Sequence, residues 1–336
     1  MTLPPSPPSS SSATAPPSPV LVLVVPLFNE AAVIARTLPL ILQQVRADVL
    51  ARTPDARITL LAIDDGSRDD TRSGLQQLAA QDASIRFAGF TRNFGKEAAI
   101  HAGLRLALDR FNADAVVVID GDLQHPPQLV GTMWAHWCDG QRVVEAVKRS
   151  RGDEGVLRRA AARLFYDAFT RASGLALSHD TDFKLLDRSV VHAVLQLGER
   201  TRFFRGIVRW LGMAGARIEF DVAPRAGGTS AWSLSGLAGY AWRNVTAFSS
   251  APLRIVSALG LLGLLLGGVL AAKALWDKLS GHALDGFSTV ILLQIIFSSL
   301  VLISLGIIGS YIARIYDEIK QRPHYVLHPD DEAPPR

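Results

Sequence analysis

The chain contains the stretch Val116-Val117-Val118-Ile119-Asp120-Gly121-Asp122, in which an apolar run ends in two carboxylates separated by one glycine. Short runs of β-branched residues are typical of strands that are buried on both faces of a sheet. In open sheets built from such strands, ligands bind at the carboxyl ends of the strands. The stretch therefore predicts a buried strand that brings an acidic pair to a binding edge.

Three further apolar runs precede this stretch, and each is followed by a segment with helical spacing. Strands are expected at 20–25, 58–63 and 85–90, and helices at 29–51, 69–82 and 96–111. Strands that alternate with helices predict an α/β fold with a mostly parallel sheet and helices on both faces. Because parallel strands point the same way, the residues after each strand should meet at one edge. Those residues are Asn29-Glu30, Asp64-Asp65, Asn93 and Asp120-Gly121-Asp122.

Composition excludes several classes of protein. The chain has 336 residues, 49% of them apolar, and its mean hydropathy is +0.21, so part of it is expected to leave water. Its 35 basic and 31 acidic residues give a net charge of +4, too small to indicate a nucleic-acid-binding surface. The single cysteine, Cys138, excludes an intrachain disulfide and a cluster of thiolate metal ligands.

The C-terminal third is strongly apolar. Residues 255–272 and 286–313 contain no Asp, Glu, Lys or Arg, and a helix needs roughly 20 apolar residues to cross a hydrocarbon core of about 30 Å. Two membrane-spanning helices are therefore expected, the alternative being two core helices of a water-soluble fold. Small residues on one side of the first helix predict that the two helices pack closely. These residues are Gly260, Gly263, Gly267 and Gly268.

The acidic pair suits a metal ion. Asp120 and Asp122 can both reach one hard divalent cation, and Gln124 can add a carbonyl oxygen. Mg²⁺ or Mn²⁺ accepts such ligands and keeps positions open for a diphosphate, whose developing charge it would neutralise. The alternative is a polar turn in which Gly121 adopts a positive φ. His125 is weighed as a further ligand, but it is expected to line the turn.

Asp64 and Asp65 form a second acidic strand end. Adjacent carboxylates repel each other, so a base N–H or the hydroxyls of a ribose are the groups expected to bind them. The alternative is local, with Ser67 or Asp69 capping the helix that follows. Both interpretations are compatible.

Four motifs occur in order along the chain. They are Val25-Pro26-Leu27-Phe28-Asn29-Glu30, Ile63-Asp64-Asp65-Gly66-Ser67, Arg92-Asn93-Phe94-Gly95-Lys96 and Ile119-Asp120-Gly121-Asp122-Leu123-Gln124-His125-Pro126-Pro127. Together they resemble the family 2 glycosyltransferases, which have the GT-A fold. The most similar subgroup is the polyprenyl-phosphate glycosyltransferases, such as dolichol-phosphate mannose synthase and its bacterial undecaprenyl-phosphate relatives. The resemblance runs from about Val20 to Arg322.

The resemblance implies a role for each matching residue. The nucleotide-sugar donor would be held by Pro26, Asn29, Glu30, Asp64, Asp65, Arg225 and Ser230. The metal would be held by Asp120, Asp122 and Gln124, and the acceptor phosphate by Arg149 and Arg151. Asp182, in an Asp-Phe-Lys element, would orient the acceptor or act as a base, which makes Asp120, Asp122 and Asp182 the implied catalytic residues. The chain departs from the family pattern at Gly121, His125 and Lys184, where Ala, Asp and Arg are usual.

The implied reaction is an inverting transfer of a sugar from a UDP- or GDP-linked donor to a polyprenyl phosphate of the undecaprenyl type. The cofactor would be Mg²⁺ or Mn²⁺, the partners would be the donor, the lipid and the membrane without nucleic acid, and a homo-oligomer is allowed. Two alternatives stay open. One is a processive polysaccharide synthase, whose Gln-x-x-Arg-Trp motif is matched at Arg209-Trp210 but has Gly206 in place of Gln. The other is a non-catalytic membrane scaffold that binds nucleotides.

These inferences divide the chain into six parts. They are a disordered tail (1–19), a GT-A catalytic domain (20–231), an amphipathic juxtamembrane helix (232–253), transmembrane helices at 254–275 and 286–313, and a cytoplasmic tail (314–336). Basic residues flank the outer ends of the two spans, at Arg243, Arg254, Arg314, Lys320 and Arg322. This bias predicts an inner-membrane protein whose catalytic domain and both termini are cytoplasmic.

Overall fold

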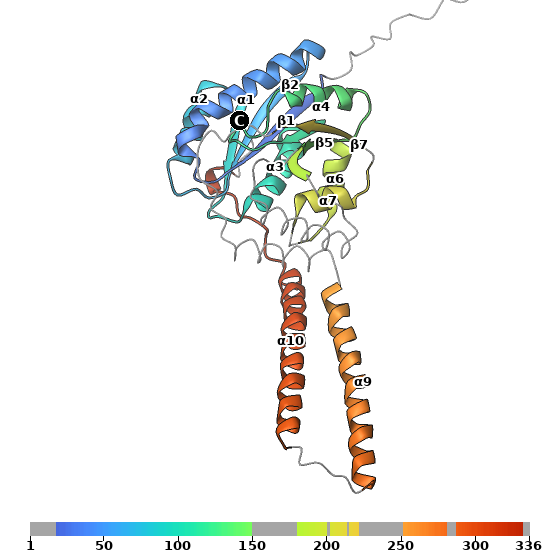
Figure 1. Ribbon diagram of the computed structural model, residues 1–336. Helices are drawn as coiled ribbons and strands as arrows, with labels where there is room; N and C mark the ends of the chain where they lie inside the picture. Colours follow the sequence, from blue (N-terminus) through green and yellow to red (C-terminus); the bar gives the residue numbers. More distant parts are fainter. Residues whose placement is uncertain are drawn as a thin grey trace, which may run out of the picture.

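A computed structural model of the protein describes residues 18–149, 180–199, 202–213, 215–221, 251–280 and 287–331. In this part of the chain, an α/β domain is followed by two long helices that project from it side by side (Figure 1). Of the predicted disordered tail 1–19, all but the last two residues lie outside the described ranges. The predicted juxtamembrane helix 232–253 lies outside them up to residue 250.

The domain is built on a seven-stranded sheet with the order β3-β2-β1-β4-β6-β5-β7. The strands are β1 (Val20–Leu27), β2 (Arg57–Asp64), β3 (Ile85–Gly89), β4 (Ala115–Val118), β5 (Val143–Lys148), β6 (Asp180–Asp187) and β7 (Gly215–Phe220). Strands β1 to β4 pair in parallel, β5 pairs in parallel with β7, and β6 is antiparallel to both of its neighbours. The predicted α/β fold with a mostly parallel sheet is therefore confirmed.

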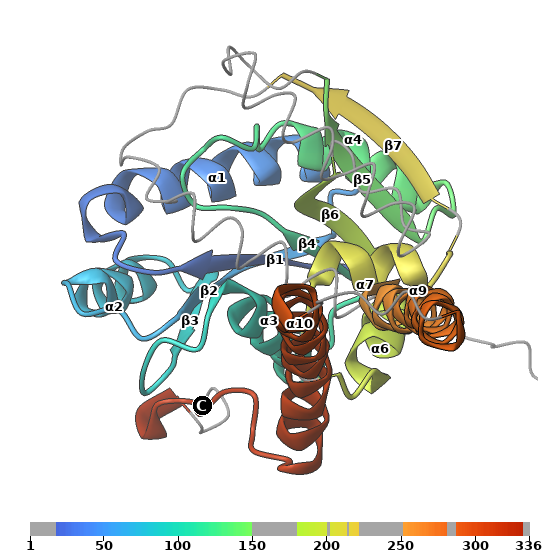
Figure 2. The ribbon, with the colours of Figure 1, turned by 60° about the horizontal axis from the view of Figure 1, so that its bottom comes forward.

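Helices cover both faces of the sheet, as Figure 2 shows. Residues of α1 (Ala31–Arg52), α2 (Thr71–Gln81) and α4 (Leu129–Cys138) join the core cluster on one face. Residues of α3 (Lys96–Phe111), α6 (Arg188–Gln196) and α7 (Phe204–Trp210) join the cluster on the other. Every helix and strand expected between residues 20 and 119 is present, with bounds within two residues of the predicted ones.

Strand β1 explains the uninterrupted apolar run. Leu21 and Leu23 belong to the core beneath α1, whereas Val22 and Val24 belong to the core beneath α3. All four side chains are fully buried, and each such burial contributes about 1.5–3 kcal/mol. Both faces of β1 are apolar, so a shift of one residue would exchange one buried apolar face for the other. The apolar pattern alone therefore does not decide the register, and pairing with β2 and β4 does. In the observed register Leu27 lies level with Asp64 of β2, so the two strands end together.

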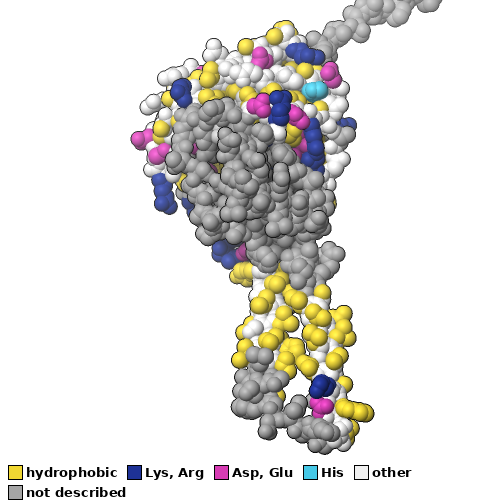
Figure 3. Space-filling view, viewed as in Figure 1, with side chains coloured by type: hydrophobic (Ala, Val, Ile, Leu, Met, Phe, Trp, Pro, Cys, Tyr) yellow, Lys and Arg dark blue, Asp and Glu magenta, His cyan; other side chains and the backbone are white. Residues whose placement is uncertain are grey.

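The two projecting helices are α9 (Ala251–Leu279) and α10 (Phe287–Ile319). Figure 3 shows mostly apolar side chains on the visible parts of both, apart from a basic and an acidic group near the end far from the domain. Within α10, Leu293–Ile319 is long and apolar enough to cross a membrane, with a mean hydropathy of 2.2. No residue of its most apolar 18-residue stretch is buried inside the protein. The apolar part of α9 is shorter, Val256–Leu270. One helix therefore meets the criterion for a span, and the second predicted span stays a prediction.

Only part of the predicted glycine packing is present. A Cβ on Gly263 would lie 3.6 Å from the ring of Phe297 in α10, so this glycine faces the neighbouring helix. At Gly260, Gly267 and Gly268 a Cβ would meet nothing within 4 Å. Of these four described positions, the close approach of the two helices involves Gly263 alone.

The chain after α10 turns back onto the domain. It ends, in the described ranges, with the short 3-10 helix η1 (Pro329–Asp331), which contacts β3 (Figure 2). Leu327 forms an antiparallel bridge with Phe90, just beyond β3. Because β3 is the last strand on its side of the sheet, this returning segment covers an edge that would otherwise expose unpaired backbone groups.

Replacing Gly103 of α3 by Ala is expected to destabilise the domain. The new Cβ would lie 2.2 Å from Cγ1 of Val24, a branched and fully buried side chain of β1 that has no space to move. Alanine gains at most about 1 kcal/mol of helix propensity over glycine, whereas overpacking costs about 1–3 kcal/mol. Thermal unfolding of the full chain in detergent should therefore show a lower Tm. Gly198→Ala, at a position with open space, is the control, and an unchanged Tm for Gly103→Ala would contradict the close packing.

Candidate active site

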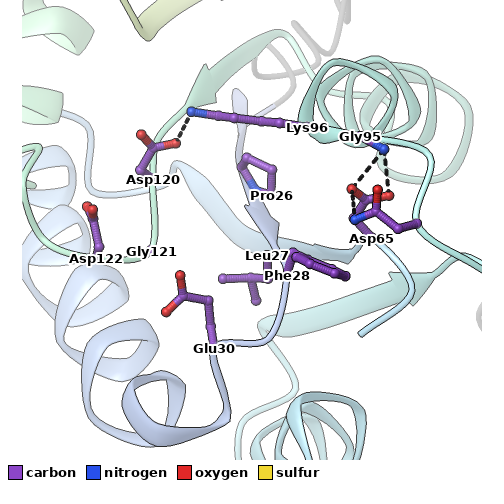
Figure 4. Close-up of a pocket in the computed structure, with 11 residues that line it drawn as sticks. Pro26, Leu27, Phe28, Glu30, Asp65, Gly95, Lys96, Asp120, Gly121 and Asp122 are labelled. Atoms are coloured by element: carbon purple, nitrogen blue, oxygen red, sulfur yellow. Dashed lines mark hydrogen bonds and ion pairs between the residues drawn. The ribbon is translucent and has the colours of Figure 1, made fainter. Parts of the chain in front are cut away.

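A cavity of about 310 Å³ lies at the carboxyl ends of β1, β2 and β4. It is lined by Pro26, Leu27, Phe28, Glu30, Asp65, Asn93, Gly95, Lys96, Asp120, Gly121 and Asp122. Figure 4 shows Asp120, Asp122 and Glu30 on one side and Asp65 on the other, with Pro26 to Phe28 between them. The volume is at the lower end of the range of small-molecule sites. The strand ends predicted to meet at one edge do meet there.

The loops after β1 and β2 are joined by hydrogen bonds. The backbone N–H of Asn29 donates to Oγ of Ser67, and the N–H of Ala31 donates to Oδ2 of Asp69. In return, Oδ1 of Asn29 accepts from the N–H of Arg68 at 2.9 Å. Asn29 has a φ of +55°, a left-handed conformation that Asn tolerates better than most residues. These bonds hold the two loops at a fixed spacing on one side of the cavity.

Asp65 is held in place by the loop that follows β3. Its carboxylate accepts hydrogen bonds from the N–H of Phe94 at 2.7 Å, the N–H of Gly95 at 2.9 Å and the side-chain amide of Asn93 at 3.0 Å. Burial raises the pKa of Asp65, although the bonds from Phe94 and Gly95 oppose that rise. The side chain is thus preorganised, with its partners coming from one loop. Asp64 is buried and does not line the cavity; its Oδ1 accepts from the N–H of Ser67.

The acidic pair after β4 lines the cavity from a turn, but the positive φ predicted for Gly121 is wrong. A Cβ at Gly121 would lie 2.8 Å from Cδ2 of Leu27, whose side chain would have to shift. The N–H of Asp120 donates to Nδ1 of His125, whose ring stacks on Phe183 at 5.0 Å. Burial lowers the pKa of His125, which leaves a neutral ring that lines the turn.

Lys96, at the start of α3, connects the acidic pair to β6. Its Nζ lies 2.7 Å from Asp120 Oδ1 and 2.8 Å from Asp182 Oδ2. Burial disfavours the charged form, but the two carboxylates outweigh it and raise the pKa of Lys96 above its ordinary value. One ammonium therefore compensates two anions from different strands.

Asp182 is also bound by Arg205 of α7, in a two-pronged contact of 2.6 and 3.0 Å. Burial alone would raise the pKa of Asp182, but Lys96 and Arg205 hold it well below its usual range. A carboxylate stabilised by two cations is a poor proton acceptor. The contact of Asp182 with Lys96 instead suits a role in holding the Lys96 ammonium in place.

Of the residues expected to hold the donor or metal, Pro26, Glu30, Asp65, Asp120 and Asp122 line the cavity. The described residues Asn29, Asp64 and Gln124 are not part of that lining. Arg149 follows β5 and pairs with Glu219 at 3.5 Å and Asp221 at 3.1 Å. Arg151, Arg225 and Ser230 lie outside the described residues.

The sequence alone predicts no role for Lys96 or Arg205. Lys96 closes the third motif, but its reach to two separate strands depends on the antiparallel insertion of β6 between β4 and β5. Arg205 lies more than 20 residues beyond Asp182 and directly precedes the partial motif that ends in Arg209-Trp210, to which it does not belong. The sequence signal for these cations is Asp182 itself, because a carboxylate within a buried strand needs a basic partner.

Glu97 should make stability depend on pH. Its Oε2 accepts from the N–H of Phe204 at 2.8 Å, and burial, with the nearby charge of Asp182, raises its pKa from 4.5 to about 7. Between these values the folded protein binds a proton that the unfolded chain releases, so stability falls as pH rises through this window. Glu97→Gln should weaken the loss of Tm between pH 5 and pH 8, whereas Glu219→Gln, at an exposed glutamate, should not. An unaltered pH slope in Glu97→Gln would contradict the assignment.

Comparison with known proteins places most of the domain in a known family. The family described as Glycosyl transferase family 2 matches residues 22–217. An uncharacterized glycosyltransferase of Bacillus subtilis, YkcC, is 35% identical over 91% of this chain and 92% of its own length. A bactoprenol glucosyl transferase of Shigella phage SfV is 34% identical over 91% of this chain and 97% of its own length.

Solved structures are more distant. Glucosyl-3-phosphoglycerate synthase from Mycobacterium tuberculosis, in complex with Mn²⁺ and uridine-diphosphate-glucose, is 21% identical. The match covers 67% of this chain and 76% of that one, with a TM-score of 0.40.

Proposed function

The chain belongs to glycosyltransferase family 2, and we propose that it transfers a sugar from a nucleotide donor to the phosphate of a polyprenyl phosphate. The predicted family and enzyme class are thereby confirmed. The acceptor is supported by relatives named bactoprenol glucosyl transferase, of which the chain spans 96–97%. This agreement over nearly the whole length includes the C-terminal helices. It favours the lipid acceptor over the processive synthase and the scaffold.

The observation that carries the proposal is the arrangement of acidic groups in one cavity. Asp65 lies on one side, where its oriented carboxylate can accept hydrogen bonds from a base or ribose. Asp120 and Asp122 lie on the other side, where the diphosphate and sugar of the same donor would be. A nucleotide sugar has this polarity, with a neutral hydrogen-bonding end and an anionic end.

A divalent cation fits the second side. Asp120 and Asp122 line the same cavity after β4, and carboxylate oxygens are the ligands that Mg²⁺ and Mn²⁺ prefer. No group of three or more acidic, His or Cys side chains in the described ranges could hold a metal ion, so diphosphate oxygens would complete the coordination. When bound, the cation would neutralise the charge that develops on the leaving nucleoside diphosphate.

The reaction we propose needs no strong base. An oxygen of the lipid phosphate attacks the anomeric carbon, the bond from that carbon to the donor diphosphate breaks, and the configuration inverts. A phosphate is already anionic at neutral pH, so no proton has to be removed. Asp182 then serves to position Lys96, in keeping with its two ion pairs. The rate depends mainly on alignment and on electrostatic stabilisation.

The basic side chains at the end of β5, near Asp120, are suited to bind the phosphate of the lipid acceptor. Lys148 ends β5, and burial together with the charge of Arg205 lowers its pKa. Arg149 follows it, and its present partners Glu219 and Asp221 are exposed acids that a phosphate can replace. We assign the lipid phosphate to this side of the cavity, together with the predicted Arg151.

The membrane arrangement is part of the proposal. We assign both α9 and α10 to the bilayer, because the two form one hairpin with exposed apolar surfaces. Lys273 and Asp277, an ion pair at 2.8 Å, lie near the end of α9 farthest from the domain. The domain then lies on the cytoplasmic side, as the basic flanks predict.

The direct test uses purified protein with undecaprenyl phosphate, Mg²⁺ or Mn²⁺, and labelled UDP-glucose, UDP-N-acetylglucosamine and GDP-mannose. We expect one donor to give a labelled lipid and one nucleoside diphosphate per sugar transferred. A labelled polymer would instead indicate a processive synthase. Nucleotide binding without any product would indicate the scaffold.

Asp122→Ala should remove turnover. Loss of one carboxylate at the diphosphate end is expected to lower kcat by at least about a hundredfold. The same assay measures this, with Asp55→Ala, an exposed carboxylate before β2, as the matched control. Both variants should insert into membranes like the wild type, and full activity in Asp122→Ala would overturn the placement of the cation.

A further inference from the structure

The segment from Lys320 to Asp331 makes specific contacts with the domain rather than hanging from α10. The N–H of Thr91 donates to the carbonyl of Val326 at 3.1 Å, and the N–H of His328 donates to the carbonyl of Gly89 at 2.7 Å. The ring of Tyr325 stacks on that of Phe90 with centroids 5.0 Å apart. We call residues 320–331 the C-terminal strap.

Asp331 anchors the end of the strap. Its Oδ2 accepts from the N–H of Gly89 and from Arg72 Nη1, both at 2.8 Å, and its carbonyl accepts from Arg110. Only 8% of its side chain is exposed. The adjacent Asp330 differs: its side chain is 77% exposed and lies 4.0 Å from Arg72. Two neighbouring carboxylates thus have very different contacts.

The residues that the strap fixes begin the loop that holds Asp65. Gly89 ends β3, and Phe90 and Thr91 follow directly. Phe90 is nearly buried and also contacts Phe94 edge to face at 5.7 Å. The N–H of Phe94 is the 2.7 Å donor to Asp65. A continuous set of contacts therefore runs from Asp331 and Tyr325, through residues 89–94, to the donor side of the cavity.

The contacts within the loop come from Arg92, which lies 4.1 Å from the ring centroid of Phe94 and donates to the carbonyl of Asn93 at 3.3 Å. Residues 91–95 form no helix or strand, and the side chains of Arg92 and Asn93 are exposed. Gly66 is so close to it that a Cβ would lie 2.2 Å from the carbonyl carbon of Arg92. The loop is thus packed between the Gly66 turn and the strap, and removing the strap leaves one side without a partner.

We infer that the C-terminal strap is a positioning element of the donor site, which holds the loop 91–95 so that Asp65 is oriented to receive the nucleoside. The identity of the ligand as a nucleoside rests on the proposed function, whereas the contacts between the strap and the loop do not. It also ties α10 to the cavity, because only the strap separates Ile319 from Asp331. Asp331 and Tyr325 act through the loop and do not touch the donor.

The first experiment measures the loop directly. Hydrogen exchange of backbone amides in the full chain should be faster by at least about threefold over residues 89–95 in Asp331→Ala, because local opening becomes easier. Asp330→Ala is the matched control and should exchange like the wild type. This readout needs no donor and no transfer activity. Equal protection in Asp331→Ala and the wild type would overturn the inference.

The second experiment measures the consequence for the donor. With undecaprenyl phosphate and whichever of the three nucleotide sugars and two cations supports transfer by the wild type, Asp331→Ala should raise the donor KM by about three- to tenfold, while kcat and the lipid KM change by less than about twofold. A general loss of folded protein would lower the active fraction without this split. If kcat falls and the donor KM stays constant, the strap does not position the donor.

The two experiments separate the two proposals. If the wild type transfers no sugar from any tested nucleotide, the proposed function fails, while hydrogen exchange still decides the role of the strap. If transfer occurs and the loop is insensitive to Asp331→Ala, the proposed function stands and the strap inference fails. Tyr325→Phe, which keeps the stacked ring, should behave like the wild type in both measurements.

Discussion

Charge compensation at the carboxyl edge of the sheet is the constraint on which the site depends. Parallel strands that end together bring several carboxylates close to one another, and their repulsion must be offset. Lys96 provides the offset by pairing with Asp120 and Asp182 at once. The pairing also joins α3 to β4 and β6, so one ammonium links three elements around the cavity. Arg205 completes the set from α7.

The sequence was sufficient for the first half of the fold. Residues 20–119 alternate apolar runs with helical spacing, and local pattern decides such elements because both faces of each strand are buried. The antiparallel strand β6 was not predicted as a strand, since its run contains Asp182 and Lys184. Lys184 is fully buried and pairs with Glu145 of β5 at 2.7 Å. A charge that is neutralised across a sheet cannot be recognised from one strand.

The difference between local pattern and tertiary pairing also explains which parts of the site could be predicted. Asp65, Asp120 and Asp122 follow directly from strand ends, so their meeting in one cavity was predictable. The partners of Asp65 come from the backbone of the loop after β3, and backbone donors leave no trace in composition. Asn29 shows the reverse case: a motif residue whose side chain joins two loops. Motifs indicated which residues matter, and tertiary contacts decided what each one touches.

The returning C-terminal strap also has a consequence for biosynthesis. Asp331 and Gly89 lie 242 positions apart in the chain, and both long helices are made between them. The edge of the sheet at β3 therefore stays open on the ribosome until the segment after α10 has been made. Only after α9 and α10 have left the ribosomal tunnel can the strap reach that edge. The loop that holds Asp65 can therefore reach its final packing only after both helices have emerged.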